Sequence, residues 1–335
     1  MTDNEKIDIN KKIKEMKELN LETVDQRLDI IIDKINGGEI KKVVFLLGAG
    51  ISVSSGIPDY RSADGFYNNL DPSLLSIRSK KDIEMIKNNQ TYLLSSEFFE
   101  KNQLPLLETK RSFVLESLEK KYKPTLTHWF LRLCHEKQIL HHIYTQNIDN
   151  LEVETGIPQN KITQLHGTID KAICHFCYNI YPINDFYEHM KNNIKDIKDP
   201  NNLTKSKKLL CHKCNKAGIK PDIVLFGDQL NEISFDESKE ADLIIISGTS
   251  LKVFPANKIP LNVPIECSRI IINNELPFIP DFLESDTFDL FIEGNCDESF
   301  LEFTSYLGWT DDLIKLIKKN KKKISEKSLE LLLQD

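Results

Sequence analysis

The chain has 335 residues, of which 40% are hydrophobic and 28% charged, and its formal net charge is −7 at pH 7. This apolar content suffices for a folded core, while the acidic balance argues against a protein that mainly coats nucleic acid. No apolar run reaches the ~18 residues needed to cross a bilayer, and the N-terminal residues lack the Arg-rich composition of a mitochondrial presequence. We therefore expect a soluble globular protein of the cytoplasm, the nucleus or both, with no membrane partner and no specific nucleic-acid binding.

Residues 1–37 are predicted to form an N-terminal helical extension. Between Ile9 and Ile35, apolar residues recur at helical spacing among many charged ones. The apolar run Val43–Leu47 then predicts the first buried strand. The segment Gly48–Ser62, which follows this strand directly, is the most informative part of the sequence.

The glycines of this segment indicate a phosphate-binding corner. Gly48 and Gly50 permit a tight turn and let backbone N–H groups approach a pyrophosphate closely. The spacing departs from the G-x-G-x-x-G fingerprint because the third glycine is Gly56, so a plain structural turn remains an alternative. An acid, an aromatic ring and a guanidinium follow in succession, which favours a site for a ribose and a nicotinamide. These three residues are Asp59, Tyr60 and Arg61.

Further short apolar runs, separated by helical spans, predict an α/β fold. We expect a Rossmann-like parallel sheet with helices on both faces, plus a smaller lobe of helices and a structural zinc module. The later strands are expected at Ile139–Thr145, Lys161–Leu165, Asp222–Phe226, Leu243–Ser247 and Arg269–Asn273. We assign residues 38–70, 139–167 and 219–310 to the Rossmann-like domain, 71–138 to the helical part of the smaller lobe, 168–218 to the zinc module and 311–335 to a helical, lysine-rich tail.

Two C-x-x-C pairs are the basis for the zinc module. In a reducing compartment, four thiolates close a tetrahedral site and leave no position for the water that a catalytic zinc ion needs. The 33 residues between the pairs exceed the usual zinc-ribbon spacing, which we attribute to an inserted loop. A redox dithiol is the alternative, although it normally uses one C-x-x-C beside a strand-to-helix turn. The predicted ligands are Cys174, Cys177, Cys211 and Cys214.

Hydrogen-bonding residues follow four of the predicted strands. Parallel sheets bind ligands at the carboxyl ends of their strands, where amides and a carboxylate can recognise a carboxamide and ribose hydroxyls. Helix capping explains Asp149 or Ser250 singly, but not the four strand ends together. The residues concerned are Gln146, Asn147, Ile148 and Asp149, then His166, then Gly248, Thr249 and Ser250, and finally Asn273, Asn274 and Glu275.

Taken in this order, the motifs resemble those of the sirtuin family of NAD-dependent protein lysine deacylases, and most of all its deacetylase class. The resemblance covers residues 40 to about 315. It leaves out the N-terminal extension and the lysine-rich tail. It rests on Gly48–Ser62, Lys123–His128, Tyr144–Asp149, His166–Gly167, the two cysteine pairs, Lys220–Asp228, Gly248–Pro255, Ile272–Glu275, Gly294–Asp297 and Leu307–Trp309.

The resemblance implies NAD as co-substrate, one structural zinc ion, and His166 and Asn147 as catalytic residues. In this family the acyl oxygen of the lysine attacks C1′ of the nicotinamide ribose, and the histidine then acts as a general base on a ribose hydroxyl. The residues implied to bind NAD are Ala49, Gly50, Ile51, Ser52, Val53, Asp59, Tyr60, Arg61, Gln146, Asn147, Ile148, Asp149, Gly248, Thr249, Ser250, Asn273, Asn274, Glu275 and Cys296. The acyl-lysine peptide would add as a strand beside Val224, Leu225, Phe226, Gly227 and Val253.

Three positions depart from the family pattern. Tyr60 stands where the family has Phe, Asp228 where it has Glu, and Asn231 where it has Pro. Relatives that remove succinyl or malonyl groups bind the acyl carboxylate with a Tyr-x-x-Arg pair, and none occurs between Tyr60 and His166. We therefore expect small neutral acyl groups, acetyl first, on histone-like or other acetyl-lysine proteins. Long-chain deacylation, protein ADP-ribosylation and a non-catalytic scaffold that binds NAD and zinc remain alternatives.

Overall fold

The computed structural model describes residues 26–62, 64–199, 205–229, 233–279, 289–320 and 323–334. Residues 1–25, most of the predicted N-terminal extension, lie outside this range. Residues 26–36 form a helix, and its Leu28, Ile31, Ile32 and Ile35 are buried in the largest hydrophobic core. The described end of the extension is therefore part of the folded body.

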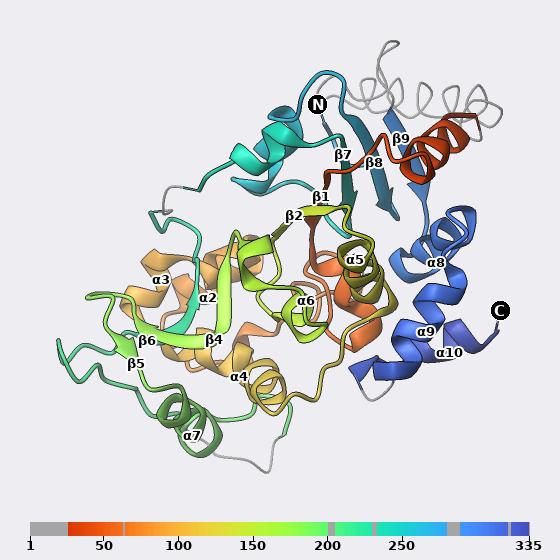
Figure 1. Ribbon diagram of the computed structural model, residues 1–335. Helices are drawn as coiled ribbons and strands as arrows, with labels where there is room; N and C mark the ends of the chain where they lie inside the picture. The colour runs from red at the N-terminus through yellow and green to blue at the C-terminus, as the bar shows by residue number, and fades with distance from the viewer. Residues whose placement is uncertain are drawn as a thin grey trace.

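The main sheet has six strands, all parallel, in the order β3-β2-β1-β7-β8-β9 (Figure 1). From β1 the chain proceeds outward on one side to β2 and β3, and from β7 it proceeds outward on the other side to β8 and β9. The connections that follow the neighbouring strands β1 and β7 therefore run in opposite directions. Such a pair of strands creates the crevice in which α/β sheets bind ligands. The strands are β1 Val43–Leu47, β2 Leu140–Thr145, β3 Ile162–Gln164, β7 Leu243–Ser247, β8 Ser268–Asn273 and β9 Asp289–Glu293.

Both faces of this sheet are covered, as the apolar strands predicted. In β1, Phe45 and Leu47 belong to the largest core, whereas Val44 and Leu46 belong to a second core on the opposite face. This alternation follows from the two-residue period of a strand. On the face covered by the largest core, the ring centroid of Phe130 lies 6.3 Å from that of Phe45 and 5.0 Å from that of Phe300. The helices of this side are α5 Leu126–Glu136, α8 Cys296–Tyr306, α9 Thr310–Asn320 and α10 Glu326–Gln334.

The C-terminal segment and α5 differ from the predicted boundaries. Residues 71–138 were expected in the smaller lobe, but α5, at the end of that range, packs on the main sheet. Residues 311–335 were expected to form a tail, yet Leu313, Ile317 and Ile324 are buried in the same core. Their apolar residues recur at helical spacing, and the sheet offers a face that these residues can cover.

The smaller lobe contains a second sheet, of three antiparallel strands in the order β5-β4-β6. The prediction that Asp222–Phe226 continues the parallel sheet is wrong, because β6 pairs antiparallel with β4 instead. Periodicity shows that such a short run is extended, but it does not show its partner or direction. The strands are β4 Gly167–Cys174, β5 Ile180–Tyr181 and β6 Ile219–Ile223. The helices around them are α2 Lys80–Asn88, α3 Ser96–Lys101, α4 Leu104–Leu118 and α7 Ile183–Asn193.

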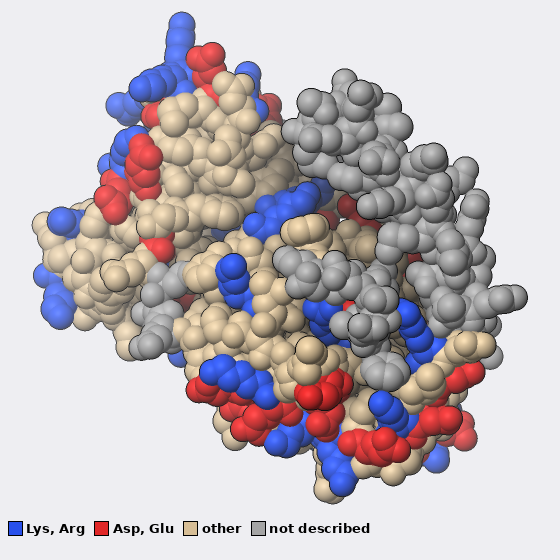
Figure 2. Space-filling view, turned by 90° about the horizontal axis from the view of Figure 1, so that it is seen from above, with Lys and Arg blue, Asp and Glu red and all other residues tan. Residues whose placement is uncertain are grey.

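Short helical turns and one further helix connect these elements. The helix is α6 Leu151–Glu154, and the turns are η1 Ala49–Ser55, η2 Pro72–Leu74, η3 Gln90–Leu94, η4 Gln159–Lys161, η5 Asp236–Glu240 and η6 Ala256–Leu261. On the face drawn in Figure 2, acidic and basic side chains are interspersed. Among the described helices, none has both the length and the apolar composition that crossing a membrane requires.

Candidate active site

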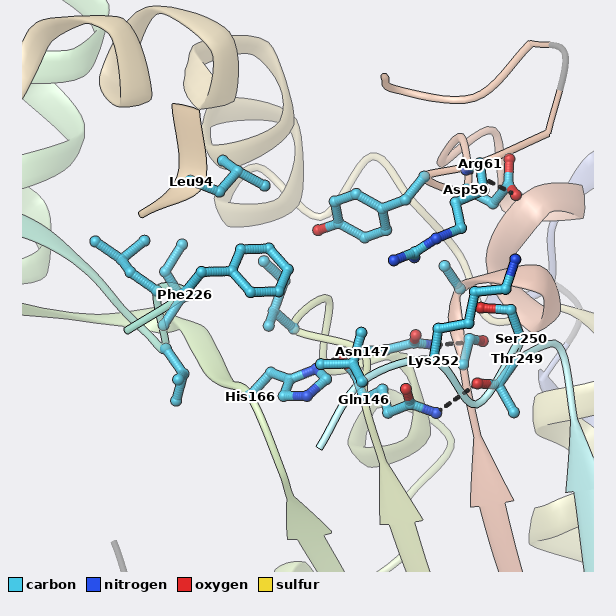
Figure 3. Close-up of a pocket in the computed structure, with 18 of the residues that line it drawn as sticks. Asp59, Arg61, Leu94, Gln146, Asn147, His166, Phe226, Thr249, Ser250 and Lys252 are labelled. Atoms are coloured by element: carbon cyan, nitrogen blue, oxygen red, sulfur yellow. Dashed lines mark hydrogen bonds between the residues drawn. The ribbon is translucent and has the colours of Figure 1, made fainter. Parts of the chain in front are cut away.

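A cavity of about 500 Å³ lies where the carboxyl ends of the main strands face the smaller lobe. In Figure 3, Leu94 and Phe226 lie on one side of this cavity, and Asp59 and Arg61 lie on the other. A volume of this size suits a small-molecule ligand, and residues from both lobes contribute to its wall. The predicted site residues that line it are Ala49, Asp59, Tyr60, Arg61, Gln146, Asn147, Ile148, His166, Val224, Leu225, Phe226, Gly227, Gly248, Thr249, Ser250 and Val253.

His166 lies just after β3, and its side chain has the arrangement that a general base needs. Its Nδ1 atom lies 3.0 Å from the main-chain carbonyl oxygen of Gln146, which can only accept a hydrogen bond. Nδ1 therefore carries the proton, and the lone pair of the neutral ring is on Nε2. Nε2 is buried and, among the described residues, has no hydrogen-bond partner. Burial lowers the pKa of His166, and the bond to Gln146 opposes this shift without cancelling it.

Two amide side chains after β2 connect this site to the glycine corner. Asn147 donates to the carbonyl oxygen of Gly48 at 3.1 Å and to the hydroxyl of Ser52 at 3.3 Å. Gln146 donates to the hydroxyl oxygen of Thr249 at 2.8 Å. Because each amide is held by groups from another strand end, both present a fixed orientation to the cavity.

Asp149 is buried beneath the cavity and is not part of its lining. Its carboxylate accepts hydrogen bonds from the Ser52 hydroxyl at 2.8 Å and from the Leu151 N–H at 3.1 Å. Burial raises its pKa, with a smaller contribution from Asp170 in the same direction. In this structure the carboxylate holds the strand end and η1 together, so its direct contact with NAD remains a prediction.

The glycines of the corner have a structural reason beyond the one predicted. A Cβ atom on Gly48 would come within 2.6 Å of the Gly248 carbonyl oxygen, and one on Gly50 within 2.6 Å of the Gly248 Cα atom. The Gly48 and Gly50 N–H groups donate to the carbonyl oxygens of Ser247 and Gly248 at 3.0 and 2.9 Å. These two amides are therefore already bonded, and the glycines are required because two backbone segments meet at this point.

The remaining predicted cofactor residues lie behind or beside the cavity. Asn273 donates to the carbonyl oxygen of Thr249 at 3.3 Å. The Ser247 hydroxyl donates to the Cys296 sulfur, also at 3.3 Å. These contacts support the loop that carries Thr249 and Ser250. The predicted residues outside the lining are Gly50, Ile51, Ser52, Val53, Asp149, Asn273, Asn274, Glu275 and Cys296.

Partly exposed apolar side chains border the cavity where a peptide strand was predicted to bind. Phe226 and Phe254 are 39% and 56% exposed, and both line the cavity. The Val224 N–H donates to the His166 carbonyl oxygen and the Phe226 N–H to that of Leu94, at 3.0 and 2.9 Å. The Leu225 N–H donates to the Asp228 carboxylate at 2.9 Å. This segment thus lies extended in the groove wall with three of its N–H groups already bonded.

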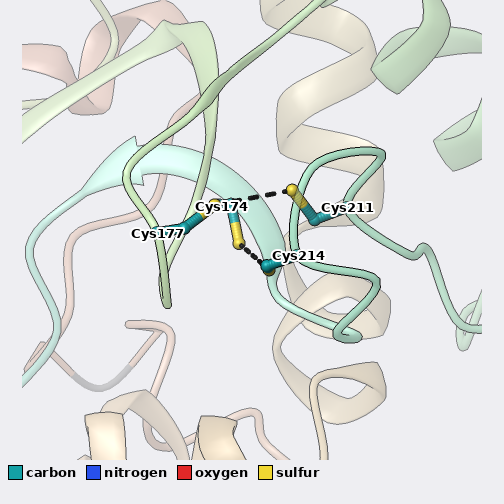
Figure 4. Close-up of side chains that lie close together, drawn as sticks. All are labelled: Cys174, Cys177, Cys211 and Cys214. Atoms are coloured by element: carbon teal, nitrogen blue, oxygen red, sulfur yellow. Dashed lines mark hydrogen bonds between the residues drawn. The ribbon is translucent and has the colours of Figure 1, made fainter.

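The four predicted zinc ligands lie together although the sequence separates them into two pairs (Figure 4). The Cys174 and Cys214 sulfurs are 3.6 Å apart, and those of Cys177 and Cys211 are 3.7 Å apart. A zinc ion about 2.3 Å from each sulfur would hold the sulfurs about 3.8 Å apart in a tetrahedron. The thiol cluster therefore fits one zinc ion with four protein ligands.

Sequence reasoning missed several residues of the cavity wall. Tyr67, Leu94 and Lys110 line it, although they lie outside every motif named in the sequence analysis. Ile223, Asp228, Lys252 and Phe254 also line it, and these four lie within the predicted motifs Lys220–Asp228 and Gly248–Pro255. Lys110 lies within α4, where a single lysine in a helix is normally interpreted as a solvated charge. No local signal placed Tyr67, Leu94 and Lys110 at the site, because they come to the cavity only in the folded chain.

Comparisons with known proteins agree with this geometry. The model of the Sir2 family matches residues 48–255, a range that includes the glycine corner, His166 and the cysteine cluster. The chain is 34% identical to the NAD-dependent protein deacetylase hst2 of Schizosaccharomyces pombe, over 87% of this chain and 80% of that relative. It is 32% identical to the NAD-dependent protein deacetylase sirtuin-3 of Mus musculus, over 84% and 77% of the two chains. It is 30% identical to the NAD-dependent protein deacetylase sirtuin-2 of Danio rerio, over 90% and 77%. Because the family model matches more than half of the chain and these relatives are at least 30% identical over most of both chains, this chain belongs to the Sir2 family.

Proposed function

We propose that this protein is an NAD-dependent protein lysine deacetylase. The observation that carries the proposal is the buried Nε2 of His166, which lines the cavity while Nδ1 is bonded to Gln146. A neutral imidazole held in one tautomer is suited to accept a proton from a substrate hydroxyl. The relatives named above are described as NAD-dependent protein deacetylases, which agrees with this role.

The residues around the cavity fit a nicotinamide nucleotide. When bound, NAD supplies an electrophilic ribose carbon and nicotinamide as the leaving group. Gln146, Asn147 and Thr249 offer fixed polar groups that would orient the carboxamide, the ribose and a phosphate. His166 would accept the proton of a ribose hydroxyl at Nε2, because its lowered pKa keeps the ring neutral near pH 7.

We propose that acetyl-lysine proteins, histone-like or other, bind as an extended segment in the groove beside Val224–Gly227. The exposed apolar side chains of Phe226 and Phe254 support this assignment. Recognition through backbone pairing tolerates many sequences, so the groove selects the modified lysine more than its neighbours. Among the described residues, the Leu225 and Phe226 carbonyl groups already accept hydrogen bonds from the Asp228 and Ser96 N–H groups, so the Val224 and Gly227 carbonyl groups are the acceptors that we propose for such a peptide.

We also propose a cytoplasmic or nuclear location and a structural role for the zinc ion. All seven cysteines are free of disulfides, and four of them form the thiol cluster. Clustered free thiols are typical of proteins in a reducing compartment. Four sulfur ligands leave the metal no open position, so its role is to hold the smaller lobe in place.

The experiment that tests this function is an assay of an acetyl-lysine peptide with purified protein and NAD. We expect the deacetylated peptide, nicotinamide and O-acetyl-ADP-ribose in equal amounts, and no reaction without NAD. Label transferred from NAD to protein in place of the acetyl ester would instead identify an ADP-ribosyltransferase. NAD binding without any turnover would identify a scaffold and would contradict the proposal.

A further inference from the structure

A second cavity, of about 540 Å³, lies between α5 and α9, and Thr155 and Gly156, just after α6, contribute to its wall. No described residue lines both this cavity and that of His166. Leu133 of α5 and Leu316 of α9 line it and are buried in the largest core, so it is formed by the folded body. A ligand bound here would be separate from NAD and from the acyl-lysine peptide.

The wall of this cavity contains a buried donor without an acceptor. Trp129 is 1% exposed, and its indole N–H has no hydrogen-bond partner among the described residues. An indole nitrogen can only donate, and burying such a group unpaired is costly. Because Trp129 lines the cavity, a bound molecule with an acceptor atom would supply the missing partner.

Positive charge exceeds negative charge around this cavity. Four cations line it against two carboxylates, which leaves a local net charge of +2, whereas the whole chain carries −7. An excess of this kind in a concave surface attracts anions. The cations are Arg132, Lys137, Lys315 and Lys319, and the carboxylates are Glu136 and Asp312.

The ion pairs at the cavity leave several donors free. Lys137 and Lys315 share one carboxylate, that of Asp312, at 2.7 and 3.9 Å. Three N–H groups of Arg132 donate to Glu136 and to the Gly156 carbonyl oxygen, so two of its five remain. Among the described residues, Lys319 forms no ion pair. The side chains of Arg132 and Lys137 are only 24% and 27% exposed, so both are held in the wall.

Phosphate groups match this set of donors best. Ionised phosphate oxygens accept hydrogen bonds, and the arginine fork and the lysine ammonium are their usual partners in proteins. A phosphate group carries close to two charges where a carboxylate carries one, so it neutralises the excess more completely. A cavity of about 540 Å³ has room for more than one such group, and its enclosure by three segments suits a small molecule.

We propose that the cavity between α5 and α9 binds a small molecule that carries two or more phosphate groups. The Trp129 N–H and the free N–H groups of Arg132 donate to phosphate oxygens, while Lys315 and Lys319 balance the charge. Binding here requires neither NAD cleavage nor an acyl-lysine substrate, so this inference is independent of the proposed function.

Tryptophan fluorescence of the full-length protein can follow this binding, because both tryptophans of the chain lie at the site. Trp129 lines the cavity, and the Trp309 ring centroid lies 4.8 Å from the ammonium nitrogen of Lys137, which also lines it. The probes are tripolyphosphate, pyrophosphate and citrate. We expect a saturable change in emission with both polyphosphates, and a Kd for citrate about 10-fold higher than that for tripolyphosphate.

Two neighbouring lysines of α9 provide a matched pair of variants. Lys319 lines the cavity, whereas Lys318 is equally exposed and does not. We expect the Kd for tripolyphosphate to rise by about 10-fold or more in Lys319→Glu and by about 2-fold or less in Lys318→Glu. Trp129→Phe keeps an aromatic ring in the core and removes the N–H. Calorimetric titration should show binding about 5-fold or more weaker in this variant.

Three results would overturn this inference. The first is the absence of saturable binding of either polyphosphate to the wild-type protein. The second is an equal effect of Lys318→Glu and Lys319→Glu, or citrate binding as tight as that of tripolyphosphate, which would show general attraction of anions to a basic surface. The third is binding of an oligonucleotide or a phosphopeptide without binding of either polyphosphate. None of these results would affect the proposed deacetylation, which is assayed separately.

Discussion

The Nδ1 atom of His166 donates a hydrogen bond to the main-chain carbonyl oxygen of Gln146, 3.0 Å away. This contact joins the end of β3 to the end of β2, which are neighbours in the parallel sheet. It fixes the tautomer of the ring, and so decides which nitrogen can accept a proton.

Replacing His166 with Ala should lower NAD-dependent deacetylation by about 10²- to 10⁴-fold, the usual contribution of a general base. The melting temperature and zinc content should stay close to those of the wild type, because the ring donates one hydrogen bond and ligates no metal. The measurement is deacetylation of a peptide, followed by mass spectrometry. Normal turnover in this variant would show that another group is the base.

The pH dependence of kcat/KM should report the lowered pKa of His166 in the free protein. Burial favours the neutral ring, so its pKa in the folded protein lies below the ordinary value of 6.5. The base is active when neutral, so the rate should rise with pH through this lowered pKa and reach a plateau above it. We therefore expect the half-maximal rate at a pH below 6.5, and a steep loss of activity below that pH. The acid limb should disappear in His166→Ala, and an acid limb centred above pH 7 would contradict the assignment.

Removal of zinc should unfold the smaller lobe rather than only slow the chemistry. Cys174 and Cys211 are buried in the same hydrophobic cluster as Phe186 and Met190, so the thiol site and the lobe core depend on each other. Cys211→Ser, or treatment with a strong chelator, should lower the melting temperature and abolish activity. Metal analysis should find one zinc ion per chain in the wild type and in the nearby control Lys213→Ala. Full activity in zinc-free protein would contradict a structural role.

The C-terminal helix should contribute measurably to stability through a buried carboxylate. Asp297 accepts hydrogen bonds from the N–H and hydroxyl of Thr127, at 2.9 and 2.7 Å, and from the Ser328 hydroxyl at 2.5 Å. Asp297→Ala leaves these donors buried without an acceptor, so the free energy of unfolding should fall by about 3 kcal/mol. Ser328→Ala removes one donor and should cost about 1 kcal/mol. Urea denaturation measures the free energy of unfolding of both variants. Equal losses in the two would show that Ser328 stabilises the protein through more than its bond to Asp297.

The core of the sheet and the cysteine cluster could be predicted from the sequence because their signals are local. A run such as Val43–Leu47 shows by its apolar character that it is buried on both faces, and the structure places it between two cores. The C-x-x-C pairs show thiols at ligand spacing, and the fold brings all four within ligand distance of one another. In both cases the pattern lies within a few neighbouring residues, so it can be recognised in the sequence.

The contacts that were missed or misassigned depend on partners far along the chain. The strand at Ile219–Ile223 joins β4 rather than the main sheet, and Gly48 and Gly50 are required by the backbone of Gly248, about two hundred residues away. Lys110 gives no local sign that it lies in a cavity. Such contacts depend on which surfaces meet after folding, and single-segment patterns do not encode that.

The sequence by itself determined the class of fold, the presence of a glycine turn after the first strand, the four thiols and a histidine at a strand end, because residue type and spacing decide these features locally. Only the tertiary structure decided that the His166 proton lies on Nδ1, that Asp149 is buried beneath the site and that Lys110 faces Tyr60. Each of these depends on a hydrogen bond or contact between segments that are brought together when the two lobes pack.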